Sequence, residues 1–351
     1  MLPGEELCFA DRMSDPDRYD KPANWFRRCG RSGLKLPAVS LGFWQNFGDP
    51  GTASHGIEDP LAFHERARSL IFTAFDQGIT HFDFANNYGP PAGAAEARCG
   101  RILRDLPREE LVISSKAGFV MWPGPYGNWG SRKYLIESCD QSLDRLQLDH
   151  VDIFYHHRPD PETPLEETLG ALDTIVRTGR AHYCGISNYP GALAEEAMAV
   201  CEQQNFIRPI IHQPKYNLFH RTIESDLLPV IEQRQLGVIC FSPLAQGLLT
   251  NKYLEGIPSD SRAGSSSPFL REEQVDASMV EQVRGLNQIA QARGQSLAQM
   301  AITWILRWPT VSSALIGASR PGQITELVQA AEAPPLSQEE LDAIDRILGG
   351  N

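Results

Sequence analysis

Short apolar segments alternate along this chain with longer segments of helical period. The apolar segments are rich in β-branched and aromatic residues, and they predict eight strands at residues 38–43, 80–85, 111–116, 151–157, 181–186, 210–213, 238–241 and 313–316. The segments between them, such as 62–77 and 132–146, place apolar side chains on one helical face. Residues 25–28 and 34–36 predict a β-hairpin ahead of the first strand.

Start and stop signals mark several of the predicted helices. Thr163 opens a Thr-Pro-Leu-Glu capping box with proline at the first helical position, and Gly179 ends that helix. Ser296 opens a helix that Pro309 ends. The segment 337–348 begins with a capping box of its own, and it is one helix more than eight strand–helix units require.

Eight strand–helix units, spaced about 35 residues apart, predict an α/β fold of the (β/α)8 or TIM-barrel type. A doubly wound open sheet is the competing interpretation, but no G-x-G-x-x-G motif follows the first strand. We expect the polar residues 1–24 to be a mobile extension and residues 25–351 to form one barrel domain. The segment 243–275, rich in Gly, Ser and Pro, is predicted to be a lid or a long loop.

Composition narrows the possible partners of the protein. The 351 residues carry a net charge of −12 at pH 7, which argues against nucleic acid or an anionic membrane surface as the main partner. No apolar run reaches the ~18 residues of a transmembrane helix, and no secretory signal opens the chain. Seven cysteines lie singly, without a C-x-x-C motif, which predicts reduced thiols in a cytoplasmic protein.

Candidate chemistry gathers where the predicted strands end, because the catalytic residues of such barrels lie at the carboxyl ends of the strands. Asp83 and Lys116 end neighbouring strands, which predicts a buried ion pair, and Tyr88 follows in the next loop. A nearby ammonium lowers the pKa of a phenol from about 10, so Tyr88 would be a proton donor near neutral pH. His157, at the end of the fourth strand, is placed to hydrogen-bond the carbonyl oxygen that Tyr88 would protonate.

Simpler interpretations of these residues also exist. Asp83 and Lys116 alone suit a structural ion pair, and Lys116 alone suits a Schiff base, although a neighbouring Asp favours the charged, non-nucleophilic amine. His156 and His157 are adjacent in a strand and face opposite sides of the sheet, so a metal ion shared by the two is disfavoured. Taken singly, three further residues suit a helix cap or a half-buried aromatic: Ser187, Asn188 and Tyr216.

Together these residues resemble the catalytic tetrad of the aldo-keto reductase superfamily, with Asp, Tyr, Lys and His matched by Asp83, Tyr88, Lys116 and His157. Asp152, five residues before His157, establishes that His157 and not its neighbour is the match. The resemblance implies an NADPH-dependent reductase of small aldehydes, such as glyceraldehyde 3-phosphate or methylglyoxal, that needs no metal. In it Tyr88 would donate the proton, Lys116, held by Asp83, would tune that donor, and His157 would orient the carbonyl oxygen.

The resemblance also implies which residues hold the cofactor. Those beside the nicotinamide would be Trp44, Asp83, Ser187, Asn188, Gln213 and Tyr216, with the Tyr216 ring stacked on the nicotinamide ring. Those around the pyrophosphate would be Ser242, Pro243, Leu244, Gln246, Gly247, Lys252 and Arg262. Those at the adenosine and its 2′-phosphate would be Gly317, Ser319, Arg320, Gln323 and Glu326.

The chain departs from the superfamily pattern at the adenosine end. Leu327 stands where an Asn commonly follows the Glu of this motif. The Lys that binds the 2′-phosphate in many members is replaced by Gly317 or Ala318. A preference for NADPH over NADH would therefore depend largely on Arg320, the strong cation of this loop.

The resemblance extends over residues 25 to 348. Within the superfamily, the stretches 86–91 and 121–127 resemble the bacterial L-glyceraldehyde-3-phosphate reductases, and the potassium-channel β-subunits belong to the same branch. This placement implies a homo-oligomer. It also implies an alternative function, that of an NADPH-binding, redox-sensing subunit with slow turnover.

Overall fold

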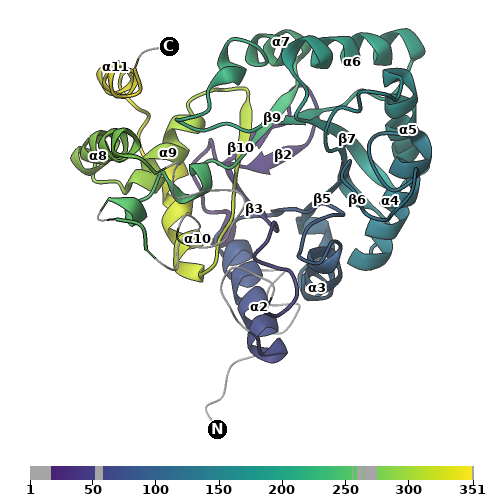
Figure 1. Ribbon diagram of the computed structural model, residues 1–351, viewed down its shortest axis with the longest axis horizontal. Helices are drawn as coiled ribbons and strands as arrows, with labels where there is room; N and C mark the ends of the chain where they lie inside the picture. The colour runs from purple at the N-terminus through teal and green to yellow at the C-terminus, as the bar shows by residue number, and fades with distance from the viewer. Residues whose placement is uncertain (1–16, 52–57, 255, 259–263, 265–274, 350–351) are drawn as a thin grey trace.

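Eight parallel strands close into a barrel in the computed structural model, which describes residues 17–51, 58–254, 256–258, 264 and 275–349 (Figure 1). The strands are β3 (Val39–Gly42), β4 (His81–Asp83), β5 (Val112–Ala117), β6 (Val151–His156), β7 (Ala181–Ser187), β8 (Ile211–Gln213), β9 (Gly237–Phe241) and β10 (Val311–Ile316). They follow one another around the barrel, and β10 closes it by pairing with both β9 and β3. The predicted TIM barrel is confirmed.

Helices surround this barrel (Figure 1). They are α2 (Pro60–Asp76), α3 (Ala94–Leu103), α4 (Arg132–Leu146), α5 (Leu165–Arg177), α6 (Gly191–Gln204), α7 (Leu228–Arg234), α8 (Ala277–Ala292), α9 (Leu297–Ile305), α10 (Pro321–Val328) and α11 (Gln338–Ile347). Helices α8 and α11 contact each other outside α9. None of the described helices has the length and apolar character needed to cross a membrane.

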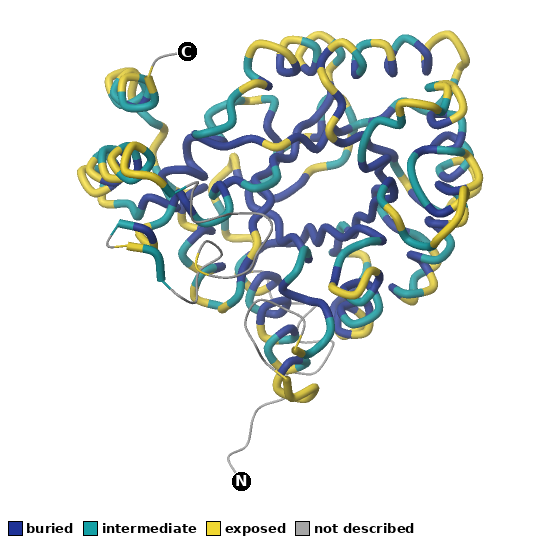
Figure 2. The backbone as a smooth tube through the Cα atoms, in the orientation of Figure 1, coloured by how far each residue is buried: buried dark blue, intermediate teal, exposed yellow. Residues whose placement is uncertain are grey.

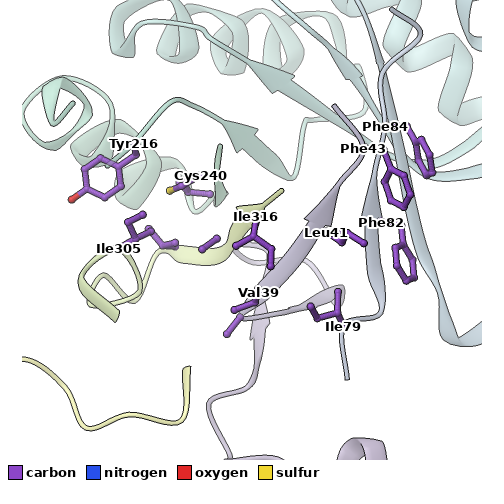
Figure 3. Close-up of a cluster of buried hydrophobic side chains, with 14 of the residues drawn as sticks. Val39, Leu41, Phe43, Ile79, Phe82, Phe84, Tyr216, Cys240, Ile305 and Ile316 are labelled. Carbon is purple, nitrogen blue, oxygen red and sulfur yellow. The ribbon is translucent and has the colours of Figure 1, made fainter. Parts of the chain in front are cut away.

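Alternation along the strands divides the core into two layers, because successive side chains of a strand point to opposite faces. Val39, Leu41 and Phe43 point out of the barrel into one apolar cluster, in which Phe43 packs on Phe82 and Phe84 (Figure 3). The strands are therefore buried on both sides, and Figure 2 shows them as a ring of buried backbone. The inner layer is a separate apolar cluster that includes Ile153, Tyr155, Ile211, Ile239 and Leu315.

The predicted hairpin covers the end of the barrel where the strands begin. It consists of β1 (Phe26–Arg28) and β2 (Lys35–Pro37), which pair antiparallel. Cys29 and Leu36 are fully buried and belong to the inner apolar cluster. Gly237, the first residue of β9, permits this close approach, because a Cβ atom there would lie 2.6 Å from the Cα atom of Cys29.

One of the two predicted capping boxes is present, the other is wrong, and the helix start predicted at Ser296 carries a further box. Ser296 and Ser337 each cap their helix with the full reciprocal pattern. Helix α5 instead begins at Leu165, after Pro164, without a side-chain cap. The Thr163 hydroxyl donates to Asp160 Oδ2 at 2.6 Å, so the carboxylate of the preceding turn takes the group that would have capped the helix.

The polar stretch predicted as a mobile extension through residue 24 contacts the barrel from Asp17 onward. Arg18 is only 3% exposed, and its guanidinium lies 4.0 Å from the centroid of the Phe75 ring in α2. Arg18 Nη1 also lies 3.0 Å from Glu110 Oε2. These contacts attach residues 17–24 to the helical layer.

Candidate active site

An ion pair between Asp83 and Lys116 lies at the centre of the candidate site. Strand β4 ends at Asp83, β5 carries Lys116, and both side chains are fully buried. Lys116 Nζ lies 2.5 Å from Asp83 Oδ2 and donates a second hydrogen bond, of 2.6 Å, to the carbonyl oxygen of Phe84. Burial lowers the pKa of Lys116, and the neighbouring Asp83 opposes that shift. The two charges thus compensate each other away from water.

A chain of hydrogen bonds runs from this ion pair through the barrel interior. Asp83 Oδ1 accepts from the Ser114 hydroxyl at 2.6 Å, and Ser114 Oγ lies 3.0 Å from Nε2 of His81. His81 Nδ1 lies 2.9 Å from Ser40 Oγ, which lies 2.6 Å from Ser313 Oγ. All of these side chains are fully buried. We call this set, from Ser313 to Asp83, the polar chain.

The ionised carboxylate determines the direction of the polar chain. An ionised Asp83 can only accept, so Ser114 donates to it. Ser114 then accepts from Nε2–H of His81, which leaves Nδ1 to accept from Ser40. Burial lowers the pKa of His81 to about 4, so the ring is neutral and this tautomer satisfies both nitrogens. Sequence reasoning missed His81 and Ser114, although they face inward two residues before Asp83 and Lys116.

Tyr88 contacts this ion pair from the loop after β4. Its ring centroid lies 4.9 Å from Lys116 Nζ and 6.0 Å from the ring centroid of His157, which it meets edge-on. Burial, with a further contribution from Asp83, raises the pKa of Tyr88 well above 10.0. The predicted lowering by Lys116 is not found, because Asp83 compensates the ammonium and burial dominates. The phenol therefore keeps its proton at neutral pH.

The two adjacent histidines have different surroundings, as their alternation predicts. His156, the last residue of β6, lies between the strand and the helices, and its Nδ1 is 2.6 Å from the Tyr189 hydroxyl. His157 packs edge-on against Phe119 with ring centroids 4.8 Å apart. Its buried Nδ1 has no hydrogen-bond partner within the described residues. Burial, together with the charge of Lys116, lowers the pKa of His157 well below its usual 6.5, so the ring is neutral.

Polar groups from β7 and β8 complete the same end of the barrel. Gln213 Nε2 donates to Asp83 Oδ1 at 3.2 Å, and the Ser187 hydroxyl donates to the Gln213 carbonyl oxygen at 2.7 Å. Asn188 has an exposed side chain whose amide donates to the His157 carbonyl oxygen at 2.9 Å. The structure therefore brings these three predicted nicotinamide contacts together with the Asp83–Lys116 pair.

Tyr216 does not lie at this end of the barrel, which we call the mouth. Its side chain is fully buried, and its ring stacks on Trp304 of α9 with centroids 5.0 Å apart. The Tyr216 hydroxyl donates to Glu224 Oε1 at 2.6 Å and accepts from Trp308 Nε1 at 2.9 Å. Figure 3 shows it among core side chains beside Cys240 and Ile305. The prediction that Tyr216 stacks on a nicotinamide ring is wrong, because both the ring and the hydroxyl are engaged in the outer core.

Phe241 is an aromatic residue that does face the mouth. It is the last residue of β9, it is partly exposed, and it packs on the inner apolar cluster. The alternation of β9 signals this position, because Ile239 points into the barrel and residue 241 must share its face. A flat apolar ring at the carboxyl end of a barrel strand suits a planar ligand.

The loop after β9 has an unusual backbone. Ser242, Ala245 and Gln246 all have positive φ angles, of 53°, 48° and 61°, a conformation that side-chain-bearing residues rarely adopt. Gln246 Nε2 donates to Ser242 Oγ at 3.1 Å. Such conformations persist where surrounding contacts over-determine them, and they concentrate at binding sites. The remaining residues predicted at the pyrophosphate on this loop are Pro243, which is buried, and Leu244 and Gly247, which are partly exposed.

Lys252 is exposed in the short 3-10 helix Asn251–Tyr253, on the same segment. Arg262, the other cation predicted at the pyrophosphate, lies outside the described residues, as does most of the predicted lid. Lys252 is therefore the one of these two predicted cations that the structure describes.

The loop after β10 presents the predicted adenosine contacts. Gly317 is exposed, and a Cβ atom there would meet nothing within 4 Å. The Gln323 side chain accepts from the backbone N–H groups of Ser319 and Arg320 at 2.8 and 3.1 Å. The Arg320 side chain itself is exposed. Glu326 instead accepts from Ser296 at 2.6 Å and so joins α10 to α9.

Leu327 is buried in the core, and it therefore offers no polar contact in place of the Asn of the family pattern.

A second cation, which sequence reasoning missed, supports this loop from α2. Arg66 Nε donates to the Ser319 carbonyl oxygen at 3.1 Å, and its Nη1 donates to the Asn46 carbonyl oxygen at 3.0 Å. Asn46 in turn donates to the Ala318 carbonyl oxygen. The partly exposed Trp44 lies two residues before Asn46. These contacts join the loop after β3 to the loop after β10, and no sequence pattern connects residues so far apart.

Comparisons with known proteins agree with this geometry. Residues 39–348 match the model of the Aldo/keto reductase family. The chain is 48% identical over 341 residues to L-glyceraldehyde 3-phosphate reductase of Escherichia coli K12, covering 95% of this chain and 94% of that protein. It is also 36% identical over 331 residues to a probable voltage-gated potassium channel subunit beta of Arabidopsis thaliana, covering 92% and 96% of the two chains.

Proposed function

The chain belongs to the aldo/keto reductase family, a family of oxidoreductases, and from that premise we propose that it reduces small aldehydes with NADPH. One observation carries the proposal: the ring of Tyr88 lies against the buried Lys116–Asp83 pair and beside the ring of His157. Glyceraldehyde 3-phosphate is the first substrate to test, given the name of the E. coli relative. Methylglyoxal, a smaller aldehyde, is the second.

The groups at the mouth fit a nicotinamide nucleotide. Gln213 and Asn188 supply amide groups for the carboxamide, and Phe241 supplies a flat apolar surface. Lys252 and Arg320 supply exposed cations for the phosphates. When bound, reduced nicotinamide supplies the hydride for the carbonyl carbon. A single extended cofactor across these loops would account for cations on two separated segments.

The chain's own residues supply the proton and its control. Tyr88 donates from its hydroxyl to the carbonyl oxygen of the aldehyde as negative charge develops there. The ammonium of Lys116 lies close enough to the ring to stabilise the phenolate that remains. Asp83 holds Lys116 in place, and the neutral His157 orients the carbonyl oxygen.

Two cations support the choice of NADPH over NADH. Arg320 is exposed on the loop after β10, and Arg66 lies directly against that loop through the Ser319 carbonyl oxygen. A 2′-phosphate there would gain charge-assisted hydrogen bonds from a guanidinium. Comparing the KM values for NADPH and NADH in an Arg320→Ala variant tests this part, because removing a phosphate contact raises the KM for NADPH alone.

The deciding test is a Tyr88→Phe variant assayed by NADPH absorbance with both aldehydes. Loss of the proton donor is expected to lower kcat by about 10²- to 10⁴-fold while NADPH binding, followed by fluorescence, is retained. Because the pKa of Tyr88 is raised, kcat of the native chain should not fall between pH 6 and pH 9 for loss of this proton. Unchanged turnover in the variant would contradict the assignment.

The same assay separates the reductase from a redox-sensing subunit. Tight NADPH binding with negligible turnover on every aldehyde would favour the subunit, in line with the channel-subunit relatives. The six described cysteines give that alternative little support. They are all free and buried, and burial raises the pKa of the Cys29 and Cys201 thiols to about 12, which makes them poor redox sensors.

A further inference from the structure

Two histidines and an aspartate meet where β6 and β7 begin, at the opposite ends of these strands from the candidate active site. His150 immediately precedes β6, Asp152 is the second residue of β6, and His182 is the second residue of β7. One ligand atom from each of the three lies within 4.8 Å of the other two. Among the described residues, this is the one such group of His, Cys, Asp and Glu side chains.

The Asp152 carboxylate is oriented by contacts on one of its two oxygens. Oδ2 accepts from the backbone N–H of Ile113 at 2.8 Å and lies 2.8 Å from Arg108 Nη2. Oδ1 is turned toward His182 Nδ1, at 3.6 Å. Outer contacts of this kind hold a metal-binding carboxylate in position. One oxygen is therefore directed at the histidines by groups that do not compete for it.

The two imidazole rings are close together, and their side chains have room to rotate. The rings of His150 and His182 stack with centroids 4.2 Å apart, and the His182 side chain is 52% exposed. Ligand atoms on a tetrahedral zinc ion, with bonds of about 2.0 Å, lie about 3.3 Å apart. The pair of Asp152 and His182 is already near that separation. Rotation of the exposed His182 side chain and of the His150 side chain, which lies outside the strand, would bring a ring nitrogen of His150 to the same separation from the other two ligand atoms.

The donor set selects the class of ion. Imidazole nitrogens suit zinc and its neighbours among the transition metals, whereas calcium and magnesium depend on several oxygen ligands. The site offers one free carboxylate oxygen, and the Arg108 guanidinium reduces the negative charge available to a hard cation. Two nitrogens and one oxygen leave a fourth tetrahedral position for water.

We propose that His150, Asp152 and His182 form a binding site for a divalent transition-metal ion of the zinc type. The ion links the starts of β6 and β7 and stabilises the folded chain, because the site exists only when the two strands are paired. It lies at the far ends of the strands from Lys116 and takes no part in aldehyde reduction. The proposal is therefore independent of the proposed function.

Isothermal titration of Zn²⁺ into the full-length protein, freed of metal with EDTA and dialysed, tests the site. We expect one ion per chain with a roughly micromolar Kd. His150→Gln and His182→Gln should each weaken this binding by at least about tenfold. His64→Gln, which changes a partly exposed histidine of α2, is the matched control and should bind as the native chain does.

Thermal unfolding provides the second measurement. Saturating Zn²⁺ should raise Tm of the native chain and of the His64→Gln variant, and the rise should be absent in His182→Gln. Binding that is unchanged in both His150→Gln and His182→Gln would overturn the proposal. The absence of saturable binding at Zn²⁺ concentrations up to about 100 times the expected Kd would overturn it as well. Aldehyde reduction by EDTA-treated His182→Gln should equal that of the native chain.

Discussion

The inside of the barrel has two unlike halves. From β10 through β3 and β4 to β5, six inward-facing side chains are hydrogen-bonded or charged, and they are Ser313, Ser40, His81, Asp83, Ser114 and Lys116. Leu315 of β10 is an apolar exception on this side. From β6 to β9, below the mouth, the inward-facing side chains are mainly apolar and include Ile153, Tyr155, Ile211 and Ile239. One barrel thus carries a hydrogen-bonded half and a close-packed half.

The two halves perform different physical tasks. In the polar chain each hydroxyl and the Nε2–H of His81 donates to one acceptor, so the direction of the hydrogen bonds orients the Asp83 carboxylate that Lys116 contacts. In the apolar half shape matters more: at Gly185 a Cβ atom would lie 2.4 Å from Tyr155 Cδ1, so glycine makes room for that ring. The polar half therefore orients charge, and the apolar half is closely packed and excludes water.

The largest effect is expected when the polar half loses its cation. Lys116→Met leaves the Asp83 carboxylate buried without a counter-charge, which destabilises the fold by about 3–5 kcal/mol. It also removes the ammonium beside Tyr88, so kcat should fall by about 10²- to 10⁴-fold. Urea unfolding and NADPH absorbance measure the two effects. Lys133→Met, at an exposed helical position, is the matched control, and an equal loss there would refute the role of Lys116.

A smaller effect, on stability, is expected in the apolar half. Ile211→Ala opens a cavity in the inner cluster and should reduce the free energy of unfolding by about 2–5 kcal/mol. Its kcat should stay near the native value at temperatures where the chain is folded, because no charge is displaced. Ile211→Val is the graded control, with an expected cost of about 0.5–1.5 kcal/mol. A large loss of kcat in folded Ile211→Ala would remove the distinction between the halves.

The smallest effect is expected inside the polar chain. His81→Leu removes the group that directs Ser114 toward Asp83, and we expect kcat to fall by about tenfold with little change in KM. His81→Gln keeps a donor and an acceptor and should restore most of the lost rate. Since the pKa of His81 is lowered to about 4, the native rate should show no titration of this ring between pH 6 and pH 8. Equal rates in the two variants would make His81 a packing residue.

Much of the catalytic geometry follows from the sequence alone. The strand pattern places Asp83, Lys116 and His157 at the carboxyl ends of consecutive strands, and parallel strands bring those ends together whatever the intervening helices contain. The same alternation distinguishes His157 from His156. Local regularity is sufficient here because each position is counted along one strand.

Other features were decided by tertiary structure. Phe241 ends β9 and Tyr216 follows the end of β8, but the path of the chain after β8 turns Tyr216 into the outer core, against Trp304. Likewise, the raised pKa of Tyr88 reflects the burial of the whole site, which no local pattern reports.

What the sequence by itself determined is the barrel, its strand order and the residues at each strand end, because alternation and helical period are properties of short segments. Only the closed barrel decided that Ser40 meets Ser313 and that Arg66 supports the Ser319 loop, since these pairs are separated by 273 and 253 residues. The last strand pairs with the first only on closure. Contacts across that seam depend on the summed twist and register of every strand between them.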